Sequence, residues 1–476
     1  MTSYDDDRWN HRSATSESRS GMMGGLIAAM MVACAWLPVT ASHAAERVNV
    51  IFILADDLGW AELGCYGNTF NETPNLDQMA REGMRFTQAY AAAPVCSPTR
   101  AAFMTGQVPA RVGITDYLRP NDPKHLSTEL TTVAEAFRAA GYTTGMIGKW
   151  HLTGYEHHGA VEIRPQAHGF QEVLVSERRG IAGGSYFWPY HFNPAIKQRL
   201  PKEHLIDRMN LEAVEFIDRH HDEPFFLYLS HYAVHTRLVG RPDLVAKYEK
   251  KLADFPDAAE RKRNPHLAAQ LQLIDEGVGM IYERLKRYGI DDKTLVVFTS
   301  DNGGEDRVTS NAPLRAGKST LYEGGVREPM IVRLPGRVPP GTTCRQPVST
   351  IDFFPTFAEI CGLEIPDSQP VDGISLRSVW EDPQTKLPDR PLWWHYPLEK
   401  PHFLGGRSAG SIRHGDWKLI QFFDTGEIEL YNLADDLGET RDLADTHPET
   451  VERLLGELNR LRREAGAEMP PIPSAP

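Results

Sequence analysis

A short apolar run that ends in two aspartates constrains the fold more than any other feature of the sequence. Residues 48–55 read VNVIFILA, a pattern typical of a strand buried on both faces, and Asp56-Asp57 follow directly. Similar short runs that stop at polar residues recur along the chain, separated by helix-like stretches. This alternation predicts an α/β protein with a large, mostly parallel sheet flanked by helices.

The remaining strands and helices of this larger domain are predicted from the same signals. Further strands are expected at residues 143–147, 225–230, 294–299 and 329–334. Helices are expected at residues 76–83, 130–140, 205–219 and 266–288, with another at Asp352. The chain length of 476 residues favours one large domain accompanied by a smaller one.

The composition changes near residue 389. Residues 389–401 are rich in Pro, Trp and His, and the β-like segments 411–422 and 427–433 precede a charged helix at 448–465. We therefore expect a catalytic α/β domain at 45–388 and a smaller α+β domain at 389–468 with an antiparallel sheet and a terminal helix. The proline-rich residues 469–476 are expected to form a loose tail.

The amino-terminal segment resembles an export signal. A polar stretch, 1–20, precedes an apolar run, 21–40, and small residues at Ser42 and Ala44 suit cleavage after Ala44. The polar stretch carries four acids against three arginines, where a signal peptide usually has net positive charge. The apolar run is also just long enough to span a bilayer, so an anchored protein is the alternative. We expect residues 1–44 to be a signal peptide and the protein to be periplasmic or extracellular, with membrane contact only if this segment is retained.

Charge and cysteine content exclude some classes of protein. The net charge of −13 argues against a nucleic-acid partner, because such proteins need a basic surface. Four cysteines remain after residue 44, too few for a disulfide framework in a domain of this size. A bridge between Cys344 and Cys361 and two separate thiols are both open readings.

Polar side chains at two strand ends predict a metal site. Asp56 and Asp57 leave the strand at 48–55, and Asp301 and Asn302 leave the strand at 294–299. Sites in open parallel sheets form beyond the carboxyl ends of strands, so these residues are expected to meet. Three carboxylates and an amide oxygen suit one Ca²⁺ or Mg²⁺, and no histidine or cysteine spacing indicates zinc.

The segment Cys96-Ser97-Pro98-Thr99-Arg100, followed by small residues and Thr105-Gly106, carries the strongest signal. It resembles the C-x-P-x-R motif of the type I sulfatases, arylsulfatase A-like members of the alkaline-phosphatase superfamily. The resemblance implies an alkaline-phosphatase-like fold and sulfuric ester hydrolase activity. It also implies that Cys96 is oxidised to Cα-formylglycine by a formylglycine-generating or sulfatase-maturing enzyme, and that this side chain joins the metal ligands, with Ca²⁺ favoured over Mg²⁺.

The chemistry implied by the resemblance explains the residue types. A hydrated aldehyde carries two hydroxyls on one carbon, so one can attack sulfur and the other can later expel sulfate. The helix that begins near Pro98 presents its positive end to an anion. Arg100, one turn along, is expected to hold the modified side chain or metal-bound oxygens.

Other basic residues match family positions in order. The resemblance implies that Lys149 and Lys318 grip sulfate oxygens, that His235 serves the leaving oxygen and that His151 assists collapse of the hydrate. Many relatives have proline just before the histidine that matches His235, where this chain has Val234, so a looser loop is expected. Residues 411–419 and 429–433 also resemble the small carboxyl-terminal domain of these enzymes.

Two other functions remain open at this point. A phosphodiester or phosphonate hydrolase of the same superfamily would share metal and nucleophile. A sulfated-glycan-binding protein with unconverted Cys96 is disfavoured, because a binder needs no hydrate-forming residue. The expected substrate is a sulfate ester, with a sulfated carbohydrate favoured by resemblance. Five loop residues either line a sugar subsite or are ordinary loop residues: Arg119, Trp188, His191, Arg237 and Trp394.

Overall fold

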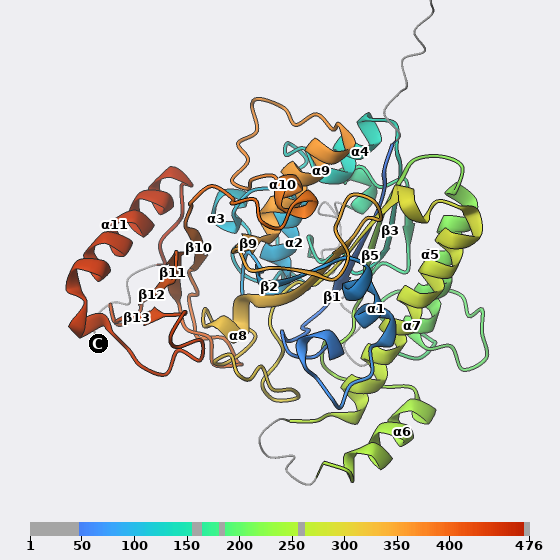
Figure 1. Ribbon diagram of the computed structural model, residues 1–476, viewed down its shortest axis with the longest axis horizontal. Helices are drawn as coiled ribbons and strands as arrows, with labels where there is room; N and C mark the ends of the chain where they lie inside the picture. The colour runs from blue at the N-terminus through green and yellow to red at the C-terminus, as the bar shows by residue number, and fades with distance from the viewer. Residues whose placement is uncertain (1–46, 155–163, 180–185, 256–261, 471–476) are drawn as a thin grey trace, which may run out of the picture. The chain divides into compact units, whose positions relative to one another are not determined.

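The computed structural model describes residues 47–154, 164–179, 186–255 and 262–470 (Figure 1). The expected signal peptide, residues 1–44, and residues 471–476 of the expected tail lie outside the described residues. In the part of the chain that is described, no helix is both long enough and apolar enough to cross a membrane.

A nine-stranded mixed sheet forms the centre of the fold. In sheet order its strands are β4 (Glu172–Leu174), β3 (Thr143–Gly148), β5 (Phe225–Ser230), β1 (Asn49–Ala55), β6 (Thr294–Ser300), β7 (Arg327–Arg333), β2 (Met84–Tyr90) and β8 (Thr342–Cys344), and β9 (Val348–Ser349) also pairs with β2. The first five strands are mutually parallel, and β7 is antiparallel to both β6 and β2. The predicted large, mostly parallel sheet is confirmed.

The register of the central strands places the polar strand ends together. In β1, Leu54 pairs with Ser230 at the end of β5, and Ala55 pairs with Ser300 at the end of β6. Because these strands run parallel, their carboxyl ends share one edge of the sheet. Asp56 and Asp301 therefore leave neighbouring strands at the same level.

Helices cover both faces of the sheet, as alternation along β1 requires. Ile51 and Ile53 join one core cluster, and Phe52 and Leu54 join the other. The first face is covered by α1 (Pro74–Glu82), α5 (Leu205–His220) and α7 (Pro265–Tyr288), and α6 (Pro242–Leu252) packs against α7 (Figure 1). The second is covered by α2 (Cys96–Thr105), α4 (Val133–Ala139), α9 (Phe353–Cys361) and α10 (Arg377–Glu381). The short helices α3 (Pro109–Val112) and α8 (Glu323–Val326) complete the set.

The carboxyl-terminal part has its own four-stranded antiparallel sheet, as predicted. Its strands are β10 (Leu392–Tyr396), β11 (Ala409–His414), β12 (Trp417–Phe422) and β13 (Ile428–Asn432), and α11 (Pro448–Glu464) packs on it. Leu454 and Leu458 of α11 are buried with Ile412, Leu419 and Leu430 of the sheet. The division into domains at residues 388 and 389 remains a prediction.

Two features differ from the sequence analysis. Strands β2, β4, β8, β9 and β10 were not anticipated; β2 is as long as β1 but pairs irregularly with β7, with a register shift between Phe86 and Ala89. The helix that carries the C-x-P-x-R motif begins at Cys96 itself rather than near Pro98. Cys65, Cys96, Cys344 and Cys361 are free thiols.

Candidate active site

Cys96 and three aspartates meet at the carboxyl edge of the central strands. Ligand atoms of Asp56, Asp57, Asp301 and Cys96 all lie within 4.8 Å of one another, and all four residues are buried. The Cys96 Sγ lies 3.6 Å from Oδ1 of Asp56. The aspartates come from the ends of β1 and β6, and Cys96 begins α2, so the main sheet and a covering helix build the cluster together.

The donor set fits a hard divalent cation. The Oδ1 of Asn302 is buried and has no hydrogen-bond partner among the described residues, while its Nδ2 donates to Asp57 Oδ1 at 2.8 Å. A buried amide oxygen without a donor costs free energy unless a cation or water meets it. Oxygens of three carboxylates and this amide are the ligands that Ca²⁺ and Mg²⁺ prefer.

Each buried carboxylate has its own cation. Lys149 Nζ lies 2.6 Å from Asp56, Lys318 Nζ lies 2.7 Å from Asp57, and Arg100 Nη2 lies 2.6 Å from Asp301. Burial by itself raises the pKa of Asp57, but nearby Lys318, His235 and Lys149 outweigh it and bring this pKa well below its usual range. Asp57 is therefore ionised at neutral pH and is paired with Lys318.

Within the cluster, Arg100 binds Asp301 rather than Cys96. Its guanidinium donates to Asp301 Oδ2, to the Lys149 carbonyl at 3.1 Å and to Ser230 Oγ at 2.5 Å. These contacts tie α2 to the ends of β3, β5 and β6. Arg100 is thus placed to hold Asp301, and its expected contact with the modified side chain remains a prediction.

The unmodified Cys96 side chain is a weak nucleophile. Burial raises the pKa of the thiol to about 12, although Lys149 and Lys318 oppose the rise. The thiol is thus protonated at neutral pH, and a thiolate is the reactive form of cysteine. A chemical role for this residue at neutral pH therefore favours its conversion to another group.

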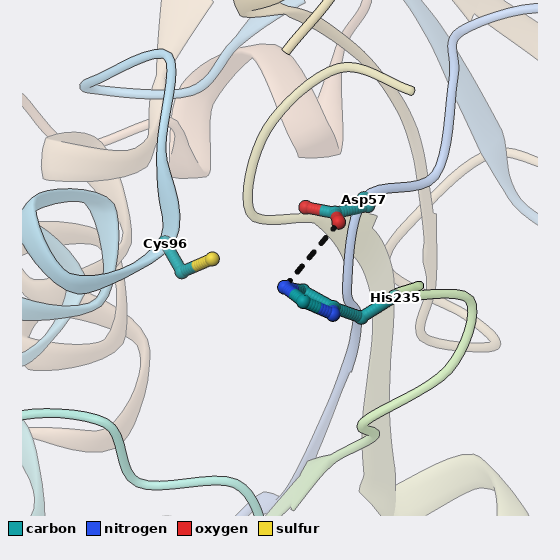
Figure 2. Close-up of side chains that lie close together, drawn as sticks. All are labelled: Asp57, Cys96 and His235. Atoms are coloured by element: carbon teal, nitrogen blue, oxygen red, sulfur yellow. Dashed lines mark ion pairs between the residues drawn. The ribbon is translucent and has the colours of Figure 1, made fainter. Parts of the chain in front are cut away.

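Two histidines face the same space. The Nε2 of His235 lies 3.7 Å from Oδ2 of Asp57, and Figure 2 shows the imidazole and the Cys96 sulfur pointing toward that carboxylate. The Nε2 of His151 is 2.9 Å from the Leu118 carbonyl oxygen. Burial, reinforced by Lys318, lowers the pKa of His235 to about 4, and burial with Lys149 lowers that of His151 well below its usual range.

The peptide before His235 is more constrained than expected. Val234 is buried, and its N–H donates to the Asp56 carbonyl oxygen at 2.6 Å. Proline has no N–H and cannot make this bond. The Val234 amide thus links the His235 loop directly to the metal-ligand candidate Asp56.

Glu177 is a residue that the sequence analysis missed. Its carboxylate accepts the N–H groups of Trp150 at 3.0 Å and His151 at 2.5 Å, and the Tyr232 hydroxyl at 2.8 Å. His151 has a φ of +54°, which is unfavourable for a side chain larger than glycine. Glu177 therefore holds the loops after β3 and β5, which carry His151 and His235.

A narrow pocket of about 160 Å³ opens on this cluster. Four of its lining residues were predicted from sequence: Cys96, His151, His235 and Lys318. Five others were missed: Tyr117, Leu118, Pro120, His402 and Phe403. The missed residues lie in connections without periodic pattern, and the only signal was the aromatic and histidine content near residues 389–403.

The five loop residues considered for a sugar subsite do not line this pocket within the described chain. Trp394 is buried, and its Nε1 donates to the Ala91 carbonyl oxygen. Trp188 is 41% exposed, and its Nε1 donates to the Ile196 carbonyl oxygen. Arg119 lies beside the pocket, with its guanidinium 4.5 Å from the centre of the Tyr117 ring.

Known proteins resemble the chain over nearly its whole described length. The sulfatase family model matches residues 48–363, and the model for the carboxyl-terminal region of N-sulphoglucosamine sulphohydrolase matches residues 316–464. A sulfatase of Formosa agariphila is 33% identical, with 89% of each chain covered. The N-acetylgalactosamine-6-sulfatase of Sus scrofa is 33% identical over 93% of this chain and 84% of its own.

A solved structure shows the same fold. The crystal structure of Ps i-CgsB is 29% identical, covers 90% of this chain and 94% of its own, and superposes with a TM-score of 0.78. The same protein has been solved in complex with k-i-k-neocarrahexaose, with a TM-score of 0.77. The similarity therefore extends through both sheets.

Proposed function

The chain belongs to the sulfatase family, and on this premise we propose that it uses a Cα-formylglycine made from Cys96. Membership makes it a sulfuric ester hydrolase. The observation that carries the proposal is the position of Cys96. This residue begins α2, and its sulfur lies 3.6 Å from Oδ1 of Asp56, within a buried cluster that includes three carboxylates. A protonated thiol is a poor nucleophile and a poor ligand for a hard cation. A side chain with hydroxyl groups could instead attack the sulfate ester and bind the divalent cation.

One divalent cation would be held by Asp56, Asp57, Asp301, Asn302 and the modified Cys96 side chain. We favour Ca²⁺ over Mg²⁺, because Ca²⁺ tolerates flexible, all-oxygen sets of six to eight ligands. When bound, such a cation lowers the pKa of a coordinated hydroxyl and withdraws charge from a sulfate ester. The free Oδ1 of Asn302 supports this assignment.

The basic side chains would bind the sulfate group and transfer protons. Lys149 and Lys318 keep their protons beside Asp56 and Asp57, so they would hold sulfate oxygens as fixed positive charges. His235 would protonate the leaving oxygen. With a pKa of about 4 it is neutral at pH 7, so it would first have to take up a proton within the cycle. His151 would accept a proton as the modified side chain is restored.

The natural substrate we propose is a sulfated carbohydrate. A relative is named for N-acetylgalactosamine 6-sulfate, and a structural neighbour binds a neocarrahexaose. The aromatic side chains Tyr117 and Phe403 line the pocket, and Phe403 is 65% exposed. Aromatic rings can stack on the apolar face of a sugar ring.

Export and maturation complete the proposal. Residues 1–44 would direct the chain to the periplasm or the exterior, or would anchor it there if retained. A formylglycine-generating or sulfatase-maturing enzyme would be a transient partner. Amino-terminal sequencing of the mature protein tests the first statement, and a start at Ala45 is expected.

The decisive experiment combines mass with activity. Intact and peptide mass spectrometry should show that sulfur is lost from residue 96, and Cys96→Ala should be folded but without turnover on an aryl sulfate. Multiple turnover by Cys96→Ala would overturn the proposed nucleophile. Preferential hydrolysis of a phosphonate monoester or phosphodiester by the wild-type protein would instead overturn the substrate class.

A further inference from the structure

A second cavity adjoins the catalytic pocket. It encloses about 500 Å³ and shares Leu118 with the smaller pocket. The same two segments wall both spaces. In residues 114–124, Tyr117 and Pro120 line the catalytic pocket, and Asp116 and Lys124 line the second cavity. In residues 397–403, residues 402–403 line the catalytic pocket and residues 397–400 line the second cavity. The two spaces are therefore neighbouring parts of one surface region.

The volumes of the two spaces indicate that they bind different parts of a substrate. Pockets that enclose drug-sized ligands usually measure about 300–1,000 Å³. The catalytic pocket, at about 160 Å³, falls below this range, and the second cavity falls within it. The catalytic pocket thus suits a sulfate group and the ring that carries it, and anything attached to that ring must extend beyond the pocket.

The second cavity has balanced charge and apolar walls. Its basic residues are Arg119, Lys124 and Lys400, and its acidic residues are Asp116, Asp122 and Glu399. Apolar contacts come from Ile114, Leu118, Pro397 and Leu398. Three basic and three acidic side chains can donate hydrogen bonds to, and accept them from, the hydroxyls of an uncharged ligand. A second sulfate would be repelled by the carboxylates as well as attracted by the basic groups.

Resting on the carbohydrate substrate proposed above, we infer that this cavity binds the next sugar of the chain and that this sugar is unsulfated. Lys124 and Lys400 are exposed and so can reach the hydroxyls of a bound ring. The enzyme therefore recognises two adjoining sugars, with the sulfated one over Cys96 and the neutral one between residues 114–124 and 397–400.

Kinetics with matched substrates test the inference. The probes are the 4- and 6-sulfates of galactose and N-acetylgalactosamine, each as a free sugar and linked to one unsulfated sugar, with an aryl sulfate as reference. For the position that is hydrolysed, kcat/KM should be about tenfold higher for the disaccharide, since one or two hydrogen bonds to charged groups have that worth. The variant Lys124→Ala with Lys400→Ala should lose most of this gain and keep aryl sulfate turnover, and Lys386→Ala, an exposed lysine outside both cavities, should match the wild type.

Each contrary outcome has a separate meaning. Equal kcat/KM for mono- and disaccharides, or an unchanged gain in the double variant, would overturn the second subsite while leaving sulfatase activity intact. A stronger preference for a disaccharide with both sugars sulfated would overturn its neutral character. Hydrolysis of the aryl sulfate but of none of the sugar esters would overturn both the subsite and the carbohydrate substrate.

Discussion

The guanidinium of Arg100 donates two hydrogen bonds to Oδ2 of Asp301, at 2.9 Å from Nε and 2.6 Å from Nη2. Both side chains are fully buried. Asp301 thus neutralises a cation inside the protein and is also one of the proposed metal ligands. These two roles can be separated, because one depends on the negative charge beside Arg100 and the other on added metal.

Replacing Asp301 should therefore reduce both stability and metal binding. Asp301→Ala removes the close partner of the buried Arg100 and leaves only Asp56, at 4.0 Å, which costs up to about 3–5 kcal/mol; Asp301→Asn should cost less because it retains an acceptor. Denaturant unfolding with chelator measures the first effect, and the rise in Tm on adding Ca²⁺ measures the second. Glu464→Ala, which breaks the exposed pair with Arg460, should change stability by less than about 1 kcal/mol. Wild-type stability of Asp301→Ala in chelator would contradict the argument.

Cys96→Ser should trap the enzyme after one turnover. Serine places one hydroxyl where we propose two, so it can accept the sulfuryl group but has no second hydroxyl with which to expel it. Incubation with an aryl sulfate should give one equivalent of product and a protein whose mass has increased by a sulfuryl group at residue 96. Sustained turnover by this variant would show that the second hydroxyl is not needed.

His235→Ala should depend on the leaving group. If His235 protonates the leaving oxygen, kcat/KM should fall by about 10²- to 10⁴-fold on a sugar sulfate and much less on an aryl sulfate, whose phenolate departs readily. His447→Ala, at an exposed histidine, serves as the control and should change neither rate. Equal losses on both substrates would leave His235 with a positioning role only.

The metal-ligand candidates could be predicted from sequence because local and long-range signals agree there. Residues 48–55 and 294–299 read as buried strands, and parallel pairing of β1 with β6 brings Asp56 and Asp301 to one edge. Strand β2 gave no comparable signal, since MRFTQAY alternates weakly and its pairing shifts at Phe86.

The mouth of the pocket could not be predicted for a different reason. Tyr117 and His402 come from separate connections, and their ring centres lie 5.4 Å apart only in the folded chain. Loop conformation is set by such tertiary contacts rather than by periodicity or turn chemistry. Glu177 was missed likewise, because its partners are backbone N–H groups, which every sequence has.

Stability should fall as pH rises through the titration of Asp275. This carboxylate in α7 accepts the N–H of Leu76 at 2.8 Å and the Asn75 amide at 2.8 Å, and burial raises its pKa from the ordinary 3.8 to about 6. The folded state then binds more protons than the unfolded state between about pH 4 and pH 6, so the stability contribution present below pH 4 is lost across this window.

The comparison with Asp275→Asn isolates this effect. The difference in free energy of unfolding, variant minus wild type, should increase by up to about 3 kcal/mol as the pH rises from 4 to 7. Asp243→Asn is the control, because Arg241 lowers the pKa of this exposed carboxylate and its removal should give no improvement in that direction. A relative stability of Asp275→Asn that is flat with pH would refute the assignment.

Glu177 should control turnover through the two histidine loops without touching substrate. Removing its carboxylate leaves the N–H groups of Trp150 and His151 without this acceptor and removes the hydrogen bond from the Tyr232 hydroxyl, while His151 keeps its unfavourable positive φ. A displacement of a catalytic group by about 1 Å can cost 10²-fold, so Glu177→Ala should lower kcat for an aryl sulfate by about 10- to 100-fold with a smaller change in KM. Glu177→Gln keeps one oxygen acceptor and should restore part of the loss, which a simple packing defect would not predict. Glu172→Ala, a half-buried glutamate five positions earlier that pairs with Arg219, should leave kcat unchanged. If Glu177→Ala turns over normally once folded, the loops hold their histidines without it, and the link from Glu177 through Tyr232 to His235 has no catalytic consequence.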